Sequence, residues 1–143
     1  MKIKIKRIDK SIPLPEYKTE GAACLDMYSR ETITIQPGEI GYIPLNVAIE
    51  LPKGTCALLV ARSSTHKLGL MKVNGVGVFD EDYKGDNDEY KFIAYNFKKQ
   101  SVTIEKGTRV AQIMIVSYNK VDIEEVEILG NKDRGGIGST GHK

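Results

Sequence analysis

The chain has 143 residues, 41% of them hydrophobic, so it suits one compact domain that can bury a core. Its 21 Lys and Arg against 19 Asp and Glu give a formal net charge of +2. Nucleic-acid binding usually needs a far more concentrated positive field, so no nucleic-acid partner is expected. No apolar run approaches the about 20 residues that span a bilayer, and the N-terminus does not resemble a signal peptide. We therefore expect no membrane partner and a cytoplasmic location, or the host cytoplasm for a viral source.

Apolar residues with a period of two dominate the chain, and this pattern predicts strands with one buried face. The runs are Ile3 and Ile5, Ile33 and Ile35, and the alternate residues from Ile43 to Leu51. Turn signals separate them at Pro37-Gly38, Pro52-Lys53-Gly54, Lys84-Gly85-Asp86-Asn87 and Lys106-Gly107. Many short strands at such spacing predict a sandwich or barrel.

Two denser runs, 56–60 and 110–116, have apolar residues on both faces, with Gln112 the one exception. They are expected to be central strands buried on both sides. Helix is scarce, and Ser64 to Leu68 is the best candidate for one short turn or helix. The two cysteines, Cys24 and Cys56, lie in apolar stretches without metal-ligand spacing, which favours buried free thiols over a disulfide.

The C-terminal segment is rich in glycine and has one aliphatic residue, Ile137, so it cannot pack on itself. The predicted organisation is therefore one β domain over residues 1–130 and a flexible arm over residues 131–143. Within the arm, residues 134–141 combine Arg134, two hydroxyl groups and four glycines able to turn N–H groups towards an anion. This composition is typical of a flexible segment that wraps around and binds phosphate, and a disordered tail is the alternative.

Residues 74–86 are predicted to form a hairpin whose second strand carries several acidic side chains. In a strand, Asp80 and Asp82 would point one way while Glu81 and Tyr83 point the other way. A carboxylate there can orient or deprotonate a water. A solvated acidic turn is the competing interpretation.

Polar side chains follow the first dense apolar run, and one polar side chain interrupts the second. Arg62, Ser63 and Ser64 come after the first run and offer donors suited to phosphate oxygens; a helix N-cap serine beside a surface arginine is the alternative. Gln112 interrupts the second run, and a buried amide needs a partner, either a backbone group or a ligand.

Taken together and in this order, the segments resemble the five motifs of the trimeric dUTP pyrophosphatase (dUTPase) family, from about Ala22 to the C-terminus. The order is far more specific than any one motif. The corresponding segments are Ala23–Met27, Ala61–Ser64, Asn74–Gly85, Gly107–Gln112 and Arg134–Gly141.

The resemblance implies an all-β, distorted jelly-roll or barrel-like sandwich with at most one short helix. It also implies a homotrimer whose active sites are shared between subunits and closed by the C-terminal arm. The implied reaction is Mg²⁺-assisted attack of water on the α-phosphorus of dUTP, giving dUMP and pyrophosphate. This reaction limits uracil in DNA and supplies dUMP for thymidylate synthesis.

The resemblance also assigns roles to individual residues. Asp80 is the base that activates water, Tyr83 lies under deoxyribose and excludes a 2′-hydroxyl, and Asp26 lies near the metal-bound triphosphate. Mg²⁺ is held mainly by phosphates and water, with no direct protein ligand. The other expected substrate-binding residues are Arg62, Ser63, Ser64 and Gln112 for phosphates, Asn74, Gly77 and Val78 for uracil, and Arg134, Gly138, Ser139 and Thr140 in the arm.

The sequence departs from the family pattern in several places, including Cys24, Ala61 and Ser64. The fifth motif is about two residues shorter than usual and has Ile137 where an aromatic residue normally covers uracil. Tyr90 or Phe92 is a candidate to supply that aromatic ring, with core packing as the alternative.

Three other functions explain the pattern less well. dCTP deaminases share the fold and an Arg-Ser-Ser segment, but the position of their general acid/base glutamate, three residues before Asn96, is Ile93 here. A non-catalytic nucleotide-binding module would not need Asp80 together with the phosphate-binding residues. A purely structural jelly roll would not need a cationic, glycine-rich tail.

Overall fold

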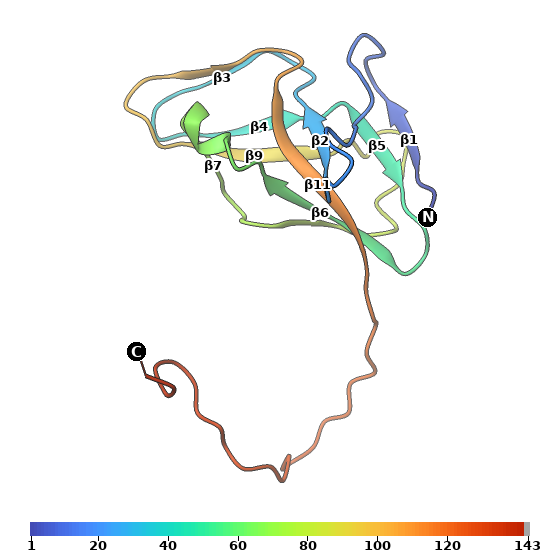
Figure 1. Cartoon of the computed structure of the whole chain (residues 1–143), viewed down its shortest axis with the longest axis vertical. Helices are drawn as coiled ribbons and strands as arrows, with labels where there is room; N and C mark the ends of the chain where they lie inside the picture. The colour runs from blue at the N-terminus through green and yellow to red at the C-terminus, as the bar shows by residue number, and fades with distance from the viewer. Residues whose placement is uncertain (142–143) are drawn as a thin grey trace.

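The computed structural model describes residues 1–141. Nearly all of the regular structure is β, and the one helix in this range is a short 3-10 helix, η1 (Figure 1). The elements are β1 (Lys4–Arg7), β2 (Leu25–Tyr28), β3 (Ile33–Ile35), β4 (Ile40–Pro44), β5 (Val47–Glu50), β6 (Thr55–Ala61), η1 (Thr65–Leu68), β7 (Leu70–Lys72), β8 (Gly77–Phe79), β9 (Lys91–Asn96), β10 (Val102–Ile104) and β11 (Arg109–Ser117). The all-β prediction and the single short helix are confirmed.

All strand pairs are antiparallel, and two sheets form the body. One has the order β2-β11-β6-β8 and the other β4-β9-β7, while β1-β5 and β10-β3 form two-stranded sheets. Fully buried side chains from both larger sheets, such as Leu59 of β6 and Phe92 of β9, belong to one hydrophobic core cluster. The core therefore joins the two sheets, and the predicted turns at Gly54 and Gly107 adopt positive φ angles of 78° and 82°.

The alternating run from Ile43 to Leu51 is divided between β4 and β5, which lie in different sheets. Asn46 lies at the break with φ 69°. Its side chain accepts a hydrogen bond from Asp9 N at 2.7 Å and donates one to Asp9 O at 2.9 Å. Every residue from 43 to 49 is buried, so the expectation of one buried face is wrong here, because the chain crosses between sheets.

The expectation that β6 and β11 are buried on both faces is also wrong for the single chain. Both strands are central, and their inner face carries buried core residues such as Ala57, Leu59 and Ile113. The outer face pairs Leu58 with Met114 and Val78, and Met114 and Val78 are 37% and 60% exposed. This outer face, which we call the β6-β11 face, is apolar and only partly covered.

Residues 74–86 do not form the predicted hairpin. β7 pairs with β9 and β8 pairs with β6, so consecutive strands join different sheets. β8 ends at Phe79, and Tyr83 N then donates to Asp80 O at 3.2 Å in a turn. The acidic residues therefore lie in a turn after β8.

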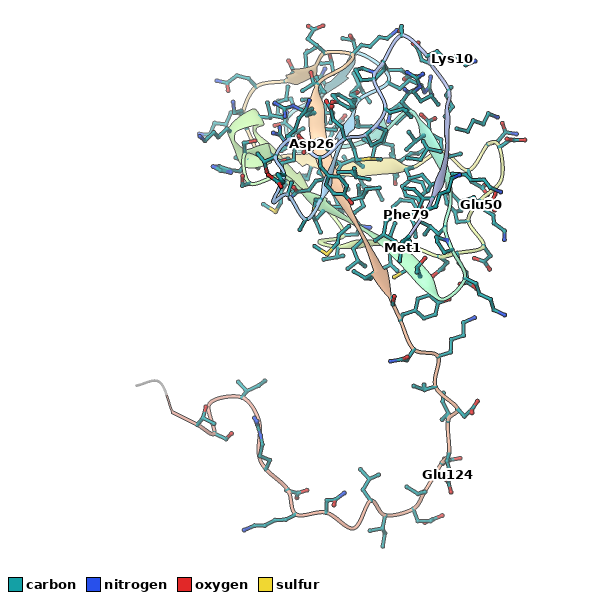
Figure 2. The ribbon with its side chains drawn as sticks, turned by 45° about the vertical axis from the view of Figure 1, so that its right-hand side comes forward. Met1, Lys10, Asp26, Glu50, Phe79 and Glu124 are labelled. Carbon is teal, nitrogen blue, oxygen red and sulfur yellow. The ribbon has the colours of Figure 1, made fainter. Side chains whose placement is uncertain are left out.

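The last strand ends at Ser117, and the following chain runs away from the body as an exposed tail (Figures 1 and 2). Two residues of the predicted arm, 142 and 143, lie outside the described residues. Cys24 and Cys56 are both free, and Cys56 is buried as expected whereas Cys24 is only half-buried. No helix within residues 1–141 has the length and apolar character needed to cross a bilayer.

Candidate active site

Four of the predicted substrate residues line one open pocket of about 370 Å³ beside β8, which we call the β8 pocket. This volume lies within the range of small-molecule sites. The four residues are Asn74, Gly77, Val78 and Tyr83. The pocket thus brings the expected uracil and sugar residues together.

Aromatic rings form one wall of the β8 pocket. Phe79 stacks on buried Tyr90 with ring centroids 3.8 Å apart, and the Tyr83 ring lies 5.7 Å from that of Phe79. Tyr83 Oη donates a hydrogen bond to Glu89 O at 3.3 Å. Burial, together with the nearby Asp88 and Glu89 carboxylates, raises the pKa of Tyr83, so its phenol stays neutral.

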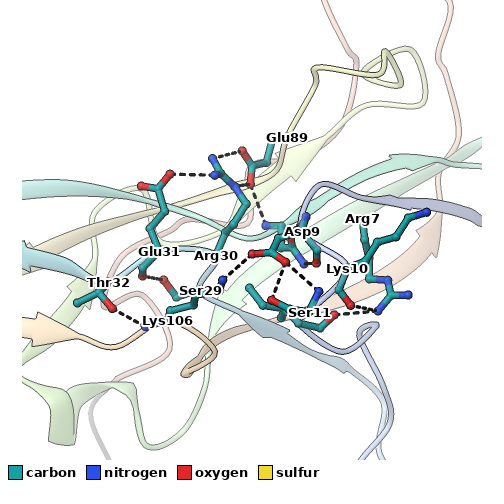
Figure 3. Close-up of polar contacts among 12 residues, drawn as sticks. Arg7, Asp9, Lys10, Ser11, Ser29, Arg30, Glu31, Thr32, Glu89 and Lys106 are labelled. Carbon is teal, nitrogen blue, oxygen red and sulfur yellow. Dashed lines mark hydrogen bonds and ion pairs between the residues drawn. The ribbon is translucent and has the colours of Figure 1, made fainter.

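The Glu89 side chain ties this wall to the rest of the fold (Figure 3). Arg30 donates from Nε and Nη2 to the two Glu89 carboxylate oxygens at 2.7 and 3.0 Å, a bidentate pair. The backbone N–H of Asn46 donates to the same carboxylate at 2.9 Å. The segment that follows Tyr83 is therefore fixed by charge-assisted hydrogen bonds.

Lys72 is a residue of this pocket that the sequence did not reveal. Its side chain is buried, with 7% exposure, and its ammonium donates to Asn74 Oδ1. The ammonium also lies 5.6 Å from the centre of the Phe92 ring. Burial lowers the pKa of Lys72. The available signal was its place two residues after Leu70, on the buried side of a strand.

Asp26, Arg62, Ser63 and Gln112 line a second pocket, which we call the arginine pocket. Asp26 is 8% exposed. Its Oδ1 lies 3.3 Å from Arg62 Nε, and its Oδ2 accepts a hydrogen bond from Arg109 Nη1 at 2.9 Å. One buried carboxylate therefore orients two guanidinium groups.

The loop after β6 is held at the edge of the arginine pocket. Thr65 Oγ1 accepts from Arg62 N at 2.9 Å and donates to Val110 O at 3.1 Å. Gln112 Nε2 donates to Ala61 O at 3.1 Å, which confirms that the amide has a backbone partner. Ser64 occupies the N-cap position of η1, but its side chain makes no capping hydrogen bond.

Two cations of the arginine pocket, Lys18 and Arg109, were absent from the predicted site. Arg109 and Arg62 contact the Asp26 carboxylate, whereas Lys18 lines the pocket while paired with Glu16. Arg109 lies inside the fourth motif, so its position was visible in the sequence. Its contact with Asp26 depends on the pairing of β11 with β2, which only the fold reveals.

Asp80 lines a third pocket, which we call the acidic pocket, together with Glu81, Asp82 and Val78. The predicted alternation of Asp80 and Glu81 is wrong, because the chain turns after β8. Within residues 1–141 the Asp80 carboxylate has no hydrogen-bond or ion-pair partner, whereas Glu81 accepts a hydrogen bond from Gly54 N. Val78 lines both the acidic pocket and the β8 pocket, so the two pockets adjoin.

The family sequence model for dUTPase matches residues 10–141. The chain belongs to the dUTPase family. It is 44% identical, over all of both chains, to the SPbeta prophage-derived deoxyuridine 5′-triphosphate nucleotidohydrolase YosS of Bacillus subtilis. It is 40% identical to the deoxyuridine 5′-triphosphate nucleotidohydrolase of Dictyoglomus turgidum, over 99% of both chains.

Solved dUTPase structures have the same fold. The crystal structure of the Streptococcus mutans dUTPase is 30% identical, with a TM-score of 0.76 over 82% of this chain and 98% of that one. The dUTPase of Staphylococcus bacteriophage 80alpha, solved with dUPNHPP, is 25% identical, with a TM-score of 0.87 over 99% of both chains.

The fifth dUTPase motif lies on the exposed tail. Arg134, Gly138, Ser139 and Thr140 are all exposed, and no described residue beyond Lys120 lines any of the three pockets. Ser139 N donates to Gly136 O at 2.8 Å, and Gly138 has a φ of 77°. The tail therefore carries short glycine turns but does not reach the pockets of its own chain.

Both aromatic candidates for the dUTPase lid are buried in the core. Tyr90 and Phe92 are both 0% exposed, so the hypothesis that either covers uracil is wrong and core packing is their role. Ile137 on the tail is fully exposed.

A protein cage for a metal is not formed within residues 1–141, since no three His, Cys, Asp or Glu side chains come together suitably. Asp26 is already engaged by two arginines.

Proposed function

We propose that the chain hydrolyses dUTP to dUMP and pyrophosphate, thereby limiting uracil in DNA and supplying dUMP for thymidylate synthesis. The observation that carries this proposal is the chemistry of the two substrate pockets. The β8 pocket has an aromatic wall and amide groups suited to a base and sugar, while the arginine pocket holds three cations suited to phosphates.

In the proposed reaction, a water oxygen bonds to the α-phosphorus as the bond from that phosphorus to the bridging oxygen breaks. Asp80 accepts the proton of the attacking water, and its carboxylate is free to do so because it has no partner among the described residues. Arg62, Ser63, Ser64 and Gln112 bind phosphate oxygens. Gln112 retains a second amide N–H beyond the one that bonds Ala61 O.

Mg²⁺ is the proposed cofactor, and it would supply charge neutralisation on the triphosphate. No side chain is assigned to coordinate it directly. Asp26 instead positions Arg62 and Arg109, which places a carboxylate near the triphosphate without using it as a ligand.

We also propose a homotrimer with shared active sites. The β8 pocket and the arginine pocket have no lining residue in common, and the tail reaches neither. In a ring, one surface of each subunit meets a different surface of the next, so separate pockets can meet across an interface. The partly covered β6-β11 face offers apolar area for such contact.

In this proposal the arm of residues 131–143 closes over the site, with Arg134, Ser139 and Thr140 donating to phosphates. Gly138 gives the backbone the freedom to wrap an anion. The cytoplasmic location and the lack of a nucleic-acid partner remain predictions.

The proposal is tested by pyrophosphate release from dUTP, dTTP, dCTP and UTP with Mg²⁺. We expect activity on dUTP alone, because Tyr83 would exclude the 2′-hydroxyl of UTP and the groups around Asn74, Gly77 and Val78 would select the uracil base over thymine and cytosine. We expect Asp80→Asn to abolish turnover, while the control Asp122→Asn, on the exposed tail, leaves it intact. Ammonia release from dCTP, or full activity of Asp80→Asn, would overturn it.

A further inference from the structure

We propose that Lys72 is a positioning residue that makes the β8 pocket select uracil over cytosine, by fixing the orientation of the Asn74 carboxamide. This inference rests on the proposed function, since it assumes that the β8 pocket holds the pyrimidine. Lys72 and Asn74 both line that pocket, at the end of β7 and in the loop leading to β8.

The Lys72 ammonium is held in place on several sides. Its side chain is 7% exposed, Phe92 lies beneath it, and a Cβ added at Gly77 would come within 3.2 Å of its Nζ. Within residues 1–141 it has no ion-pair partner, and its hydrogen-bond acceptor is Asn74 Oδ1. A buried ammonium costs free energy unless it is hydrogen-bonded, so this contact is strongly favoured.

The contact decides which end of the Asn74 amide faces Lys72. An ammonium only donates hydrogen bonds, so the carbonyl oxygen of Asn74 must face it. The Nδ2 group is then the end left for other partners. The remaining N–H groups of Lys72 are also donors. The pair therefore presents donors, and no side-chain acceptor, to a base in the pocket.

Uracil and cytosine differ at the position these donors would meet. Uracil carries a carbonyl oxygen at C4, which accepts, whereas cytosine carries an amino group there, which donates. A donor facing the cytosine amino group would leave both groups unpaired in a partly buried site. The pair thus stabilises bound uracil and disfavours cytosine.

Two substitutions separate orientation from charge. Lys72→Met removes the donor and lets the Asn74 amide turn, and Lys72→Gln keeps a polar partner that can either donate or accept. We expect each to lower the ratio of kcat/KM for dUTP to that for dCTP roughly tenfold or more. If dCTP is hydrolysed too slowly to give a kcat/KM, the inhibition constant of dCTP in the dUTP assay is used in its place. The matched control is Lys99→Met, which removes an exposed cation that lines none of the three pockets and should leave the ratio unchanged.

Melting temperatures show which variants fold. If Lys72→Met does not fold, Lys72→Gln alone still tests the inference. An unchanged ratio in a folded Lys72 variant would overturn the inference, even if turnover of both nucleotides fell. Wild-type protein that failed to hydrolyse dUTP would instead overturn the proposed function, so the two failures are distinct.

Discussion

Arg109 donates a hydrogen bond from Nη1 to Asp26 Oδ2 at 2.9 Å, across the paired strands β11 and β2. The other oxygen of the same carboxylate lies 3.3 Å from Arg62 Nε. Two guanidinium groups thus converge on one side chain that is 8% exposed. The carboxylate fixes the arginines in the geometry that the proposed phosphate site needs.

Asp26→Asn is expected to lower the free energy of unfolding by about 1–2 kcal/mol, because the charged acceptor of two partly buried arginines is lost. The KM for dUTP should rise as the arginines lose their orientation. Thermal melts and steady-state kinetics measure both effects, with Asp122→Asn as the exposed control. Unchanged stability and unchanged KM would show that Asp26 does not hold the arginines.

Gly77→Ala is expected to weaken dUTP binding by about tenfold and to lower stability by about 1 kcal/mol. The added Cβ would lie 3.2 Å from Lys72 Nζ and 3.4 Å from Leu59 Cβ, so the pocket wall must move. Gly21→Ala is the control, since its Cβ would meet nothing within 4 Å. Equal KM values for the two variants would argue against a tight β8 pocket.

Acid should remove the contribution of Glu81 to stability. The hydrogen bond from Gly54 N holds the pKa of Glu81 below its ordinary value of 4.5. Because the folded-state pKa is the lower one, this stabilisation is present above pH 4.5 and is lost as pH falls through the folded-state pKa. Glu81→Gln should therefore melt below wild type near neutral pH, with a difference that shrinks in acid. Glu124→Gln, on the tail, should show no such trend.

Ile137→Phe is expected to lower the KM for dUTP by roughly tenfold, because stacking of a base on an aromatic ring contributes about 1–3 kcal/mol. The exposed Ile123, also on the tail, provides the control Ile123→Phe. A KM unaffected by Ile137→Phe would mean that this part of the tail does not cover the base.

The strands and turns of this fold were readable from the sequence because their signals are local. Alternating Ile and Val predict strands, and glycines such as Gly54 and Gly107 supply the positive φ that tight turns require. The helix at Thr65–Leu68 and the backbone partner of Gln112 were likewise anticipated.

Other features depend on contacts between distant residues and were not readable. Asn46 breaks the run from Ile43 to Leu51 because its side chain bonds Asp9, far away along the chain. The predicted hairpin failed because β7 and β8 find partners in different sheets. The spacing of Leu70 and Lys72 places Lys72 on the buried side of β7, but the contact of its ammonium with Asn74 becomes visible only in the fold.

Shared active sites are tested most directly by combining two inactive subunits. Arg62→Ala disables the arginine pocket and Asp80→Asn disables the acidic pocket, and each variant alone should be inactive. If each site takes these residues from different subunits, trimers assembled from both variants contain sites with an intact Arg62 and an intact Asp80. We predict that co-expression restores pyrophosphate release from dUTP. Mixed oligomers as inactive as either parent would contradict the account.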